Sequence, residues 1–221
     1  MRRVFLLSPA STSGVRAKIL LRDEARFPLA VRLREEGAPL GEVFAFMSGL
    51  YFRGKLTYAR AFAEPEATFV ITATRGLVPV DTTATRALLL EFAEVDIHHE
   101  AERFTTPLAR DAKKLLVAVG GDVEVLLLGS IASKKYVDVL ASVFGERLVF
   151  PTDFVGRGDM SRGGLLLRAA SAGQELSYAP VLGAVRHGKR PPKLATSSGA
   201  APTLVPSPSR KRPRRPRRPR P

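Results

Sequence analysis

The amino-acid sequence predicts an α/β fold, with an open, largely parallel sheet, helices on both faces and a disordered basic tail at the C-terminus. Over residues 1–184, short apolar runs alternate with longer stretches of helical periodicity, a pattern typical of parallel strands joined by crossover helices. Hydrophobic residues make up 45% of the chain, which is enough for a substantial core. Residues 185–221 are rich in Pro, Ser and Arg and cannot bury enough apolar surface to offset the entropy cost of ordering. We therefore expect one α/β domain over residues 1–184 and a tail over residues 185–221.

The strands are predicted from short runs of aliphatic, aromatic and β-branched residues bounded by turn-forming residues. The first run is almost wholly apolar and ends before Pro9, as expected for a strand that is buried on both faces. A β-branched run ends at Thr72, and two runs rich in Val and Leu end at Leu128 and Phe150. The expected strands are residues 4–8, 68–72, 123–128, 148–150 and 176–181.

The helices are predicted from apolar residues at a spacing of three or four positions. A break is expected near Pro28, because proline lacks the N–H group that a helix interior requires. Phe52, Leu56 and Ala59 form one apolar stripe, and Pro107 is expected in the first turn of a later helix. The expected helices are residues 15–36 with the break, 41–47, 52–63, 84–92, where a strand is the alternative, 107–119, 133–144 and 161–170.

The positive charge is concentrated in the tail. Twelve of the Lys and Arg residues follow Ala184 and no Asp or Glu does, so residues 1–183 carry only +2 of the net charge of +14. Such a tail is expected to bind the phosphate backbone of a nucleic acid, with an affinity that depends on salt. Its last segment has Pro at every third position, which favours an extended polyproline II conformation. The predicted nucleic-acid contacts in this segment are Arg210, Lys211, Arg212, Arg214, Arg215, Arg217, Arg218 and Arg220.

Several classes of protein are disfavoured by the sequence. The chain has no Cys, which excludes disulfides, thiolate metal ligands and thiol nucleophiles. No apolar stretch reaches the roughly 18 residues that a membrane helix needs, and the apolar run after Arg3 is shorter than that of a signal peptide. We therefore expect no membrane partner and a cytoplasmic location, with nucleoid association as an option.

Small, hydroxyl-bearing or charged residues follow each predicted parallel strand. Because the carboxyl ends of parallel strands meet at one edge of a sheet, these residues are expected to gather there. Backbone N–H groups, hydroxyls and cations together favour an anion such as a phosphate. The candidate ligand-binding residues are Ser8, Ser11, Ser13, Gly14, Arg75, Ser130, Ser133, Lys134, Arg157, Asp159 and Arg162.

Each of these groups also has an alternative structural interpretation. In the first loop, Thr12 or Ser13 is expected to cap the helix that follows. In the Gly-rich stretch 156–164, either a phosphate approaches between the two Arg residues, or Asp159 or Ser161 caps a helix and the Arg side chains are solvated. Lys134 opens a helix, where the helix dipole disfavours a cation unless an anion is bound nearby.

The sequence does not specify a reaction. Asp81, Asp153 and Asp159 are candidates for a general acid or base, and the catalytic residues stay undetermined. His98 and His99 stand in an acidic segment, which is more typical of a solvated loop than of a metal site. We therefore expect no metal and no cofactor.

Four stretches, in order along the chain, resemble motifs of the bacterial peroxide-stress proteins of the YaaA type. The stretch between Leu50 and Asp81 is also similar to a small bacterial domain family of unknown function. Lys135 stands where the peroxide-stress family has Glu. The four stretches are Leu-Leu-Ser-Pro-Ala at 6–10, Arg-Gly-Leu-Val-Pro-Val-Asp at 75–81, Ala-Ser-Lys-Lys-Tyr at 132–136, and Pro-Thr-Asp-Phe at 151–154 with Ser-Arg-Gly at 161–163 ahead of Arg168.

This resemblance implies a DNA-binding protein that takes part in the response to oxidative stress. Together with the polar edge and the tail, it leads us to expect a protein that binds nucleic acid at that edge. Two alternatives remain open: an enzyme that acts on a nucleotide or nucleobase at the same edge, and a sensor of a phosphate-bearing ligand.

Overall fold

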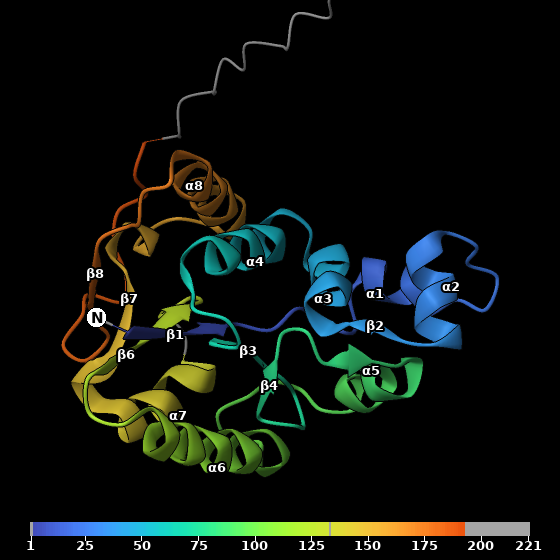
Figure 1. Ribbon diagram of the computed structural model, residues 1–221, viewed down its shortest axis with the longest axis horizontal. Coiled ribbons are helices and arrows are strands. Elements are labelled where there is room, and N and C mark those ends of the chain that lie inside the picture. Colours follow the sequence, from blue (N-terminus) through green and yellow to red (C-terminus); the bar gives the residue numbers. More distant parts are fainter. Residues whose placement is uncertain (1, 133, 193–221) are drawn as a thin grey trace, which may run out of the picture.

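Six strands form one sheet in the order β4-β3-β1-β6-β7-β8 (Figure 1). The computed structural model describes residues 2–132 and 134–192. The inner strands are parallel to one another and each edge strand is antiparallel to its neighbour. The parallel strands are β1 (Arg2–Leu7), β3 (Thr68–Ile71), β6 (Val123–Leu128) and β7 (Leu148–Pro151), and the edges are β4 (Leu77–Pro79) and β8 (Tyr178–Pro180).

Helices cover both faces of this sheet (Figure 1). The helices α4 (Leu50–Phe62) and α8 (Asp159–Ala172) pack together on one face, and α6 (Glu102–Val119) and α7 (Lys134–Phe144) pack together on the other. The central strand β1 is therefore covered on both sides, and Phe5, Leu6 and Leu7 are fully buried. This architecture confirms the predicted open α/β sheet with helices on both faces.

A group of shorter elements lies beyond the carboxyl end of β1 (Figure 1). Two very short strands pair there in antiparallel fashion. This group forms one wall of the site described below. Its members are α1 (Val15–Leu20), α2 (Pro28–Glu35), β2 (Ala38–Pro39), α3 (Leu40–Ser48), β5 (Thr83–Ala84) and α5 (Arg86–Ala93).

The elements differ from the sequence prediction at several boundaries. The predicted break at Pro28 is confirmed, since Pro28 is the first residue of α2. Helix α6 begins at Glu102, so that Pro107 lies inside it rather than in its first turn. The buried stripe of Phe104, Leu108 and Ala112 runs past the proline on the core side, and this burial favours the longer helix. Strand β4 was not predicted, because its pairing with β3 is a tertiary contact that local sequence does not show.

Two glycines let α4 and α8 approach each other closely. A Cβ atom on Gly54 would lie 2.6 Å from the carbonyl oxygen of Gly163, and one on Gly163 would lie 2.7 Å from the carbonyl oxygen of Leu50. Any side chain at either position would force the two helices apart. The crossing brings the N-terminal turn of α8 next to the first two turns of α4, and the site depends on this arrangement.

The final described residues lie against the domain. Arg186 forms an ion pair of 3.2 Å with Asp138 of α7, and a Cβ atom on Gly156 would lie 2.3 Å from the carbonyl oxygen of Lys189. The disordered tail was predicted to begin at residue 185, whereas residues 185–192 are described and contact the domain; the part from residue 193 onward, with its predicted nucleic-acid contacts between Arg210 and Arg220, lies outside the described residues. Within the described ranges, no helix combines the length and apolar character needed to cross a bilayer.

Candidate active site

A cavity of about 560 Å³ opens at the carboxyl ends of β1 and β6. The chain leaves β1 toward the face that carries α4, and it leaves β6 toward the opposite face, which carries α7 (Figure 1). Two neighbouring strands whose connections diverge in this way leave a crevice between them, where open α/β sheets bind their ligands. Ser8, directly after β1, and Ser130, shortly after β6, both line the cavity.

The lining of the cavity is divided between hydroxyl groups and apolar side chains. Charged groups are few: Asp96, Lys135 and Asp159. The volume is in the range of sites for small molecules, which are lined mainly by apolar groups with a few polar groups that fix orientation. The hydroxyl-bearing residues are Ser8, Ser11, Thr12, Ser13, Ser48, Tyr51, Ser130 and Tyr136, and the apolar ones are Pro9, Ala10, Met47, Val95 and Ile97.

A buried lysine lies directly behind Ser8. Lys55 is 0% exposed, and its Nζ atom donates to the carbonyl oxygen of Ser8 at 2.6 Å and to Ser8 Oγ at 2.8 Å. Lys55 occupies the face of α4 that also buries Phe52 and Leu56, which accounts for its complete burial. Its side chain therefore reaches the end of β1 from inside the core, and Ser8 stands between it and the cavity.

Burial lowers the pKa of Lys55 to about 7, far below its ordinary value of 10.5. The loss of hydration is the largest cause, the nearby Arg162 acts in the same direction, and Asp159 opposes both. The Nζ atom also lies 4.4 Å from the ring centroid of Tyr51 and 4.7 Å from that of Phe52. These aromatic faces attract the ammonium group, but the attraction offsets only part of the cost of removing its hydration. Near neutral pH a large fraction of Lys55 is therefore the neutral amine.

Two tyrosine hydroxyls flank this pair. Tyr136 Oη donates to the carbonyl oxygen of Ser130 at 3.1 Å, and burial raises the pKa of Tyr136 to about 12. The hydroxyl of Tyr51 is buried and has no hydrogen-bond partner among the described residues, and burial raises its pKa as well. Both phenols therefore keep their protons at neutral pH, and the hydroxyl of Tyr51 lies buried behind the cavity lining, beside the guanidinium of Arg162.

The first residue of the loop after β6, Gly129, must be a glycine. A Cβ atom on Gly129 would lie 2.8 Å from Tyr136 Oη, 2.9 Å from Ser8 Cβ and 3.3 Å from Ser8 Oγ. The absence of a side chain at Gly129 thus lets Ser8 and Tyr136 lie close together at the cavity floor. The two carboxyl-terminal strand ends are joined here by the hydrogen bond from Ser8 N–H to the carbonyl oxygen of Leu128.

The N-terminal turn of α8 contributes a carboxylate and a buried cation. Arg162 is only 8% exposed, and its guanidinium donates to the carbonyl oxygen of Phe154 at 3.1 and 3.2 Å. It also pairs with Asp159 at 3.4 Å. Asp159 in turn lines the cavity. Arg162 is therefore held behind the wall, where it fixes the segment before α8 and orients Asp159.

The structure brings together about half of the candidate residues from the sequence. Ser8, Ser11, Ser13, Gly14, Ser130 and Asp159 all line the cavity. Neither predicted cap is observed: α1 has Gly14 and α8 has Gly158 at its N-cap, and neither forms a side-chain cap. Helix α8 also begins at Asp159, two residues before the predicted start.

The predicted cations do not line this cavity, and Ser133 lies outside the described residues. Arg75 forms a two-point contact with Glu91 at 2.6 and 2.7 Å, which lowers the pKa of Glu91 to about 2. Arg157 donates to the carbonyl oxygen of Asp153 at 2.9 Å. Lys134 is exposed at the start of α7, and the neighbouring Lys135 borders the cavity instead.

The acidic candidates other than Asp159 do not line the cavity. Asp81 is exposed and pairs with Arg60 at 3.1 Å. Asp153 is exposed and belongs to the short 3₁₀ helix η2 (Thr152–Phe154), which follows β7. A second 3₁₀ helix, η1 (Gly145–Arg147), precedes that strand. Only Asp159 of the three predicted carboxylates is positioned to act on a molecule in the cavity.

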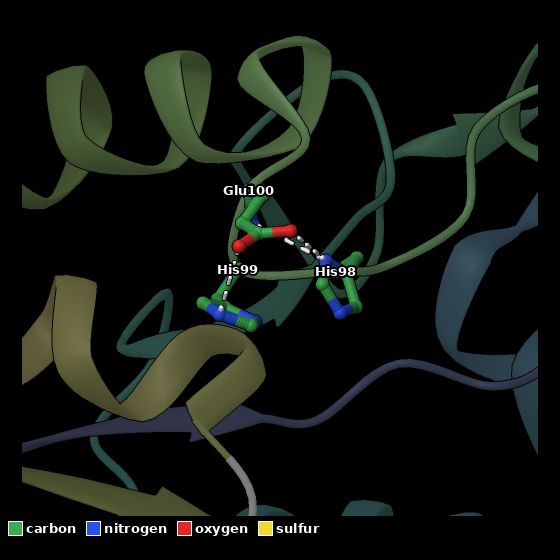
Figure 2. Close-up of side chains that lie close together, drawn as sticks. All are labelled: His98, His99 and Glu100. Carbon is green, nitrogen blue, oxygen red and sulfur yellow. Dashed lines mark hydrogen bonds and ion pairs between the residues drawn. The ribbon is translucent and has the colours of Figure 1, made fainter.

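The histidines form an exposed cluster in the loop before α6 (Figure 2). Figure 2 shows His98 and His99 on either side of Glu100, with nitrogen-to-oxygen distances of 3.7 Å to its carboxylate. One potential ligand atom from each residue lies within 4.8 Å of the others. The preceding residues Asp96 and Ile97 line the cavity, whereas the cluster itself does not. All three side chains are exposed beside the rim, and the expectation of no metal stays a prediction.

Sequence reasoning missed Lys55, Tyr51 and Tyr136. A signal for Lys55 was present, because this residue falls three positions after Phe52 and four before Ala59, inside the predicted apolar stripe. A lysine at such a position is either paired or neutral when the stripe is buried. The tyrosines gave no comparable signal, since aromatic residues on a buried helix face are ordinary core residues.

No protein-family model, curated protein or solved structure matches this chain significantly. The resemblance to the peroxide-stress family therefore stays a prediction from the sequence.

Proposed function

We propose that this protein is an enzyme that binds a small polar molecule in the cavity between β1 and β6. Of the alternatives that the sequence left open, this is the one that the geometry supports best. The observation that carries the proposal is the hydrogen-bonded pair of Lys55 and Ser8 at the cavity floor. A buried lysine with a pKa near neutrality is costly to maintain, and such groups concentrate at functional sites.

The substrate is proposed to be weakly charged or neutral. Asp96 and Asp159 contribute two carboxylates to the lining and Lys135 contributes one cation, a balance that disfavours a polyphosphate. The lining combines apolar side chains, among them Met47, Val95 and Ile97, with several hydroxyls. A flat ring with hydrogen-bonding edges fits such a lining, and nucleosides and nucleobases are the compounds of this kind that the sequence analysis anticipates.

Tyr51 provides a direct test. Its buried hydroxyl has no partner among the described residues, and leaving such a group unpaired costs about 1–3 kcal/mol. If a ligand accepts a hydrogen bond from it, Tyr51→Phe should weaken ligand binding about 10-fold while leaving the stability unchanged or higher. Binding of nucleosides, nucleobases and nucleoside monophosphates to the full chain would be measured by calorimetry.

Tyr58→Phe is the matched control for this experiment. Tyr58 is also buried on α4, but its hydroxyl bonds to Tyr178 and accepts from the N–H of Leu176, away from the cavity. This variant should lose stability and keep its affinity for the ligand. Equal affinity of wild type and Tyr51→Phe, or absence of any binding by these compounds, would contradict the proposed ligand class.

Nucleic-acid binding is a second candidate function, and one observation favours it specifically. Twelve Lys and Arg residues follow Ala184 without a single carboxylate, which is the composition of a segment that neutralises phosphates. In this proposal the tail holds the enzyme on DNA or RNA, whereas the cavity acts on a small molecule. A role in oxidative stress rests on the family resemblance alone.

A further inference from the structure

We propose that Ser8 is a nucleophile activated by Lys55, and that the enzyme transfers an acyl group from a small ester or amide bound in the cavity. The inference rests on the proposed function, because it takes the same cavity as the active site. It adds the reaction and the roles of the two residues.

The geometry of the pair is that of a nucleophile and its base. Lys55 Nζ lies 2.8 Å from Ser8 Oγ and 2.6 Å from the carbonyl oxygen of Ser8, distances within reach of proton transfer. In the neutral amine, one N–H group can donate to the carbonyl oxygen, which leaves the lone pair directed at the serine hydroxyl. Ser8 lines the cavity, whereas Lys55 is fully buried behind it. A base in this position takes and returns its proton at the Ser8 oxygen, next to the reacting carbonyl.

The surroundings of Lys55 favour the neutral amine that a general base requires. The charged and titratable groups nearest to it come from three helices: Tyr51 of α4, Tyr136 of α7, and Asp159 and Arg162 of α8. The carboxylate of Asp159 is 68% exposed on its side chain, and it also pairs with Arg162. No carboxylate among the described residues forms an ion pair with Lys55, so the lysine lacks the close counter-ion that would keep it protonated.

A donor for the developing negative charge is also present. The tetrahedral intermediate of acyl transfer carries an oxyanion that must receive hydrogen bonds. Tyr51 lines the cavity, and its hydroxyl is buried just behind the lining beside Arg162, with no hydrogen bond of good geometry to the described residues. Its ring lies against Lys55, so this donor is next to the nucleophile. Tyr136 already donates to Ser130, and we therefore assign the oxyanion contact to Tyr51, whose hydroxyl turns from Arg162 toward the cavity to make it.

The reaction balances with water as the only co-substrate. The proton of Ser8 Oγ passes to Lys55 Nζ while Oγ forms a bond to the acyl carbon. The intermediate then breaks its bond to the leaving alcohol or amine, which takes the proton from the Lys55 ammonium. Water attacks the resulting acyl-serine, its proton passes through Lys55 to Ser8 Oγ, and a carboxylic acid is released. No oxidant, reductant or metal is required.

An acyl group suits this cavity better than a phosphoryl group does. A phosphate dianion would meet the carboxylates of Asp96 and Asp159 with a single cation, Lys135, in the described lining. The carbonyl carbon of an ester or amide carries no net charge and meets no such repulsion. An acylated nucleoside or another small ester or amide would provide the electrophile.

The test is covalent labelling of the full chain with a fluorophosphonate probe, which reacts with activated serines. We expect one label, located at Ser8 by peptide mass spectrometry, and a labelling rate that rises with pH through an inflection at about 7, the pKa to which burial lowers Lys55. Lys55→Met should lower the rate about 100-fold or more, as expected on loss of a general base. Ser142→Ala removes an exposed hydroxyl of α7 that donates to the carbonyl oxygen of Val139 and does not line the cavity, and it should keep the wild-type rate.

A second variant keeps the test decisive if Lys55→Met does not fold. Tyr51→Phe removes only an unpaired hydroxyl and should fold normally, but it should slow the release of nitrophenol from a nitrophenyl ester about 10- to 100-fold. A folded wild type that is not labelled at Ser8, or a labelling rate without the inflection, would overturn the proposal. Nucleoside binding without labelling would refute only the nucleophile, whereas labelling without nucleoside binding would refute only the proposed ligand class.

Discussion

The titration of Lys55 should make the stability of this protein rise with pH above neutrality. In the unfolded chain a lysine keeps its proton up to about pH 10.5, whereas in the folded protein burial lowers the pKa of Lys55 to about 7. Between these values the unfolded state binds more protons than the folded state, so the free energy of unfolding increases with pH. The penalty for the buried charge is complete below about pH 7 and is relieved as the pH rises.

The size of the effect follows from the pKa difference. Each pH unit in this interval adds at most about 1.4 kcal/mol to the free energy of unfolding. From about pH 7 to pH 9 the gain is therefore about 2–3 kcal/mol. For a chain of 221 residues this corresponds to a rise in the melting temperature of about 4–12 °C.

The comparison requires Lys55→Met, which removes the titrating group and keeps an unbranched side chain of similar length. Other groups titrate in both proteins, so their contributions cancel in the difference between wild type and variant. Urea unfolding at several pH values gives this difference directly. We expect the stability of wild type relative to Lys55→Met to increase steadily from about pH 7 to pH 9. A difference that does not change with pH would refute a neutral Lys55 in the folded state.

Three further predictions concern the helix crossing, the buried arginine and the tail. Gly54→Ala should lower the free energy of unfolding in a urea titration by about 1–3 kcal/mol, because its Cβ atom would lie 2.6 Å from the Gly163 carbonyl oxygen. Gly121→Ala is the control, since its Cβ atom would have no atom within 4 Å. Arg162→Ala should lose about 1.5–3 kcal/mol in urea unfolding, because its buried guanidinium donates twice to one carbonyl oxygen; a loss below about 1 kcal/mol would fit an exposed side chain. A chain ending at residue 192 should keep its melting temperature, and its binding to duplex DNA, followed by fluorescence anisotropy, should be weaker and less dependent on salt.

The order and type of the main elements could be predicted from the sequence because each is specified locally. The run from Val4 to Leu7 is apolar on both faces, which identifies a central parallel strand without knowledge of its neighbours. Pro28 marks a helix start because the fixed φ angle of proline suits the first position of a helix, whatever the neighbouring residues are. Strand β4 lacks such a local mark: it is three residues long, ends in proline and exists because it pairs with β3.

The site was predictable only in its position. Residues after parallel strands do gather at one edge, and the hydroxyls after β1 and β6 line the cavity there. The sequence could not show where long side chains form their bonds. Arg75 donates to Glu91, which lies 16 residues away in the sequence. Arg162 donates to the backbone carbonyl oxygen of Phe154, whose direction depends on the turn before α8.

Gly163, in the Ser-Arg-Gly stretch, has a different role in the structure from the one that the sequence suggested. The sequence suggested that Gly163 lets a phosphate approach the backbone, but its open side faces α4, where a Cβ atom would lie 2.9 Å from the Cα atom of Tyr51. That close crossing helps to exclude water from Lys55, and the loss of hydration is the main cause of its lowered pKa. The reactivity that we propose for Ser8 therefore depends on a helix contact: the place of Lys55 in the apolar stripe could indicate its burial, but not its contact with Ser8.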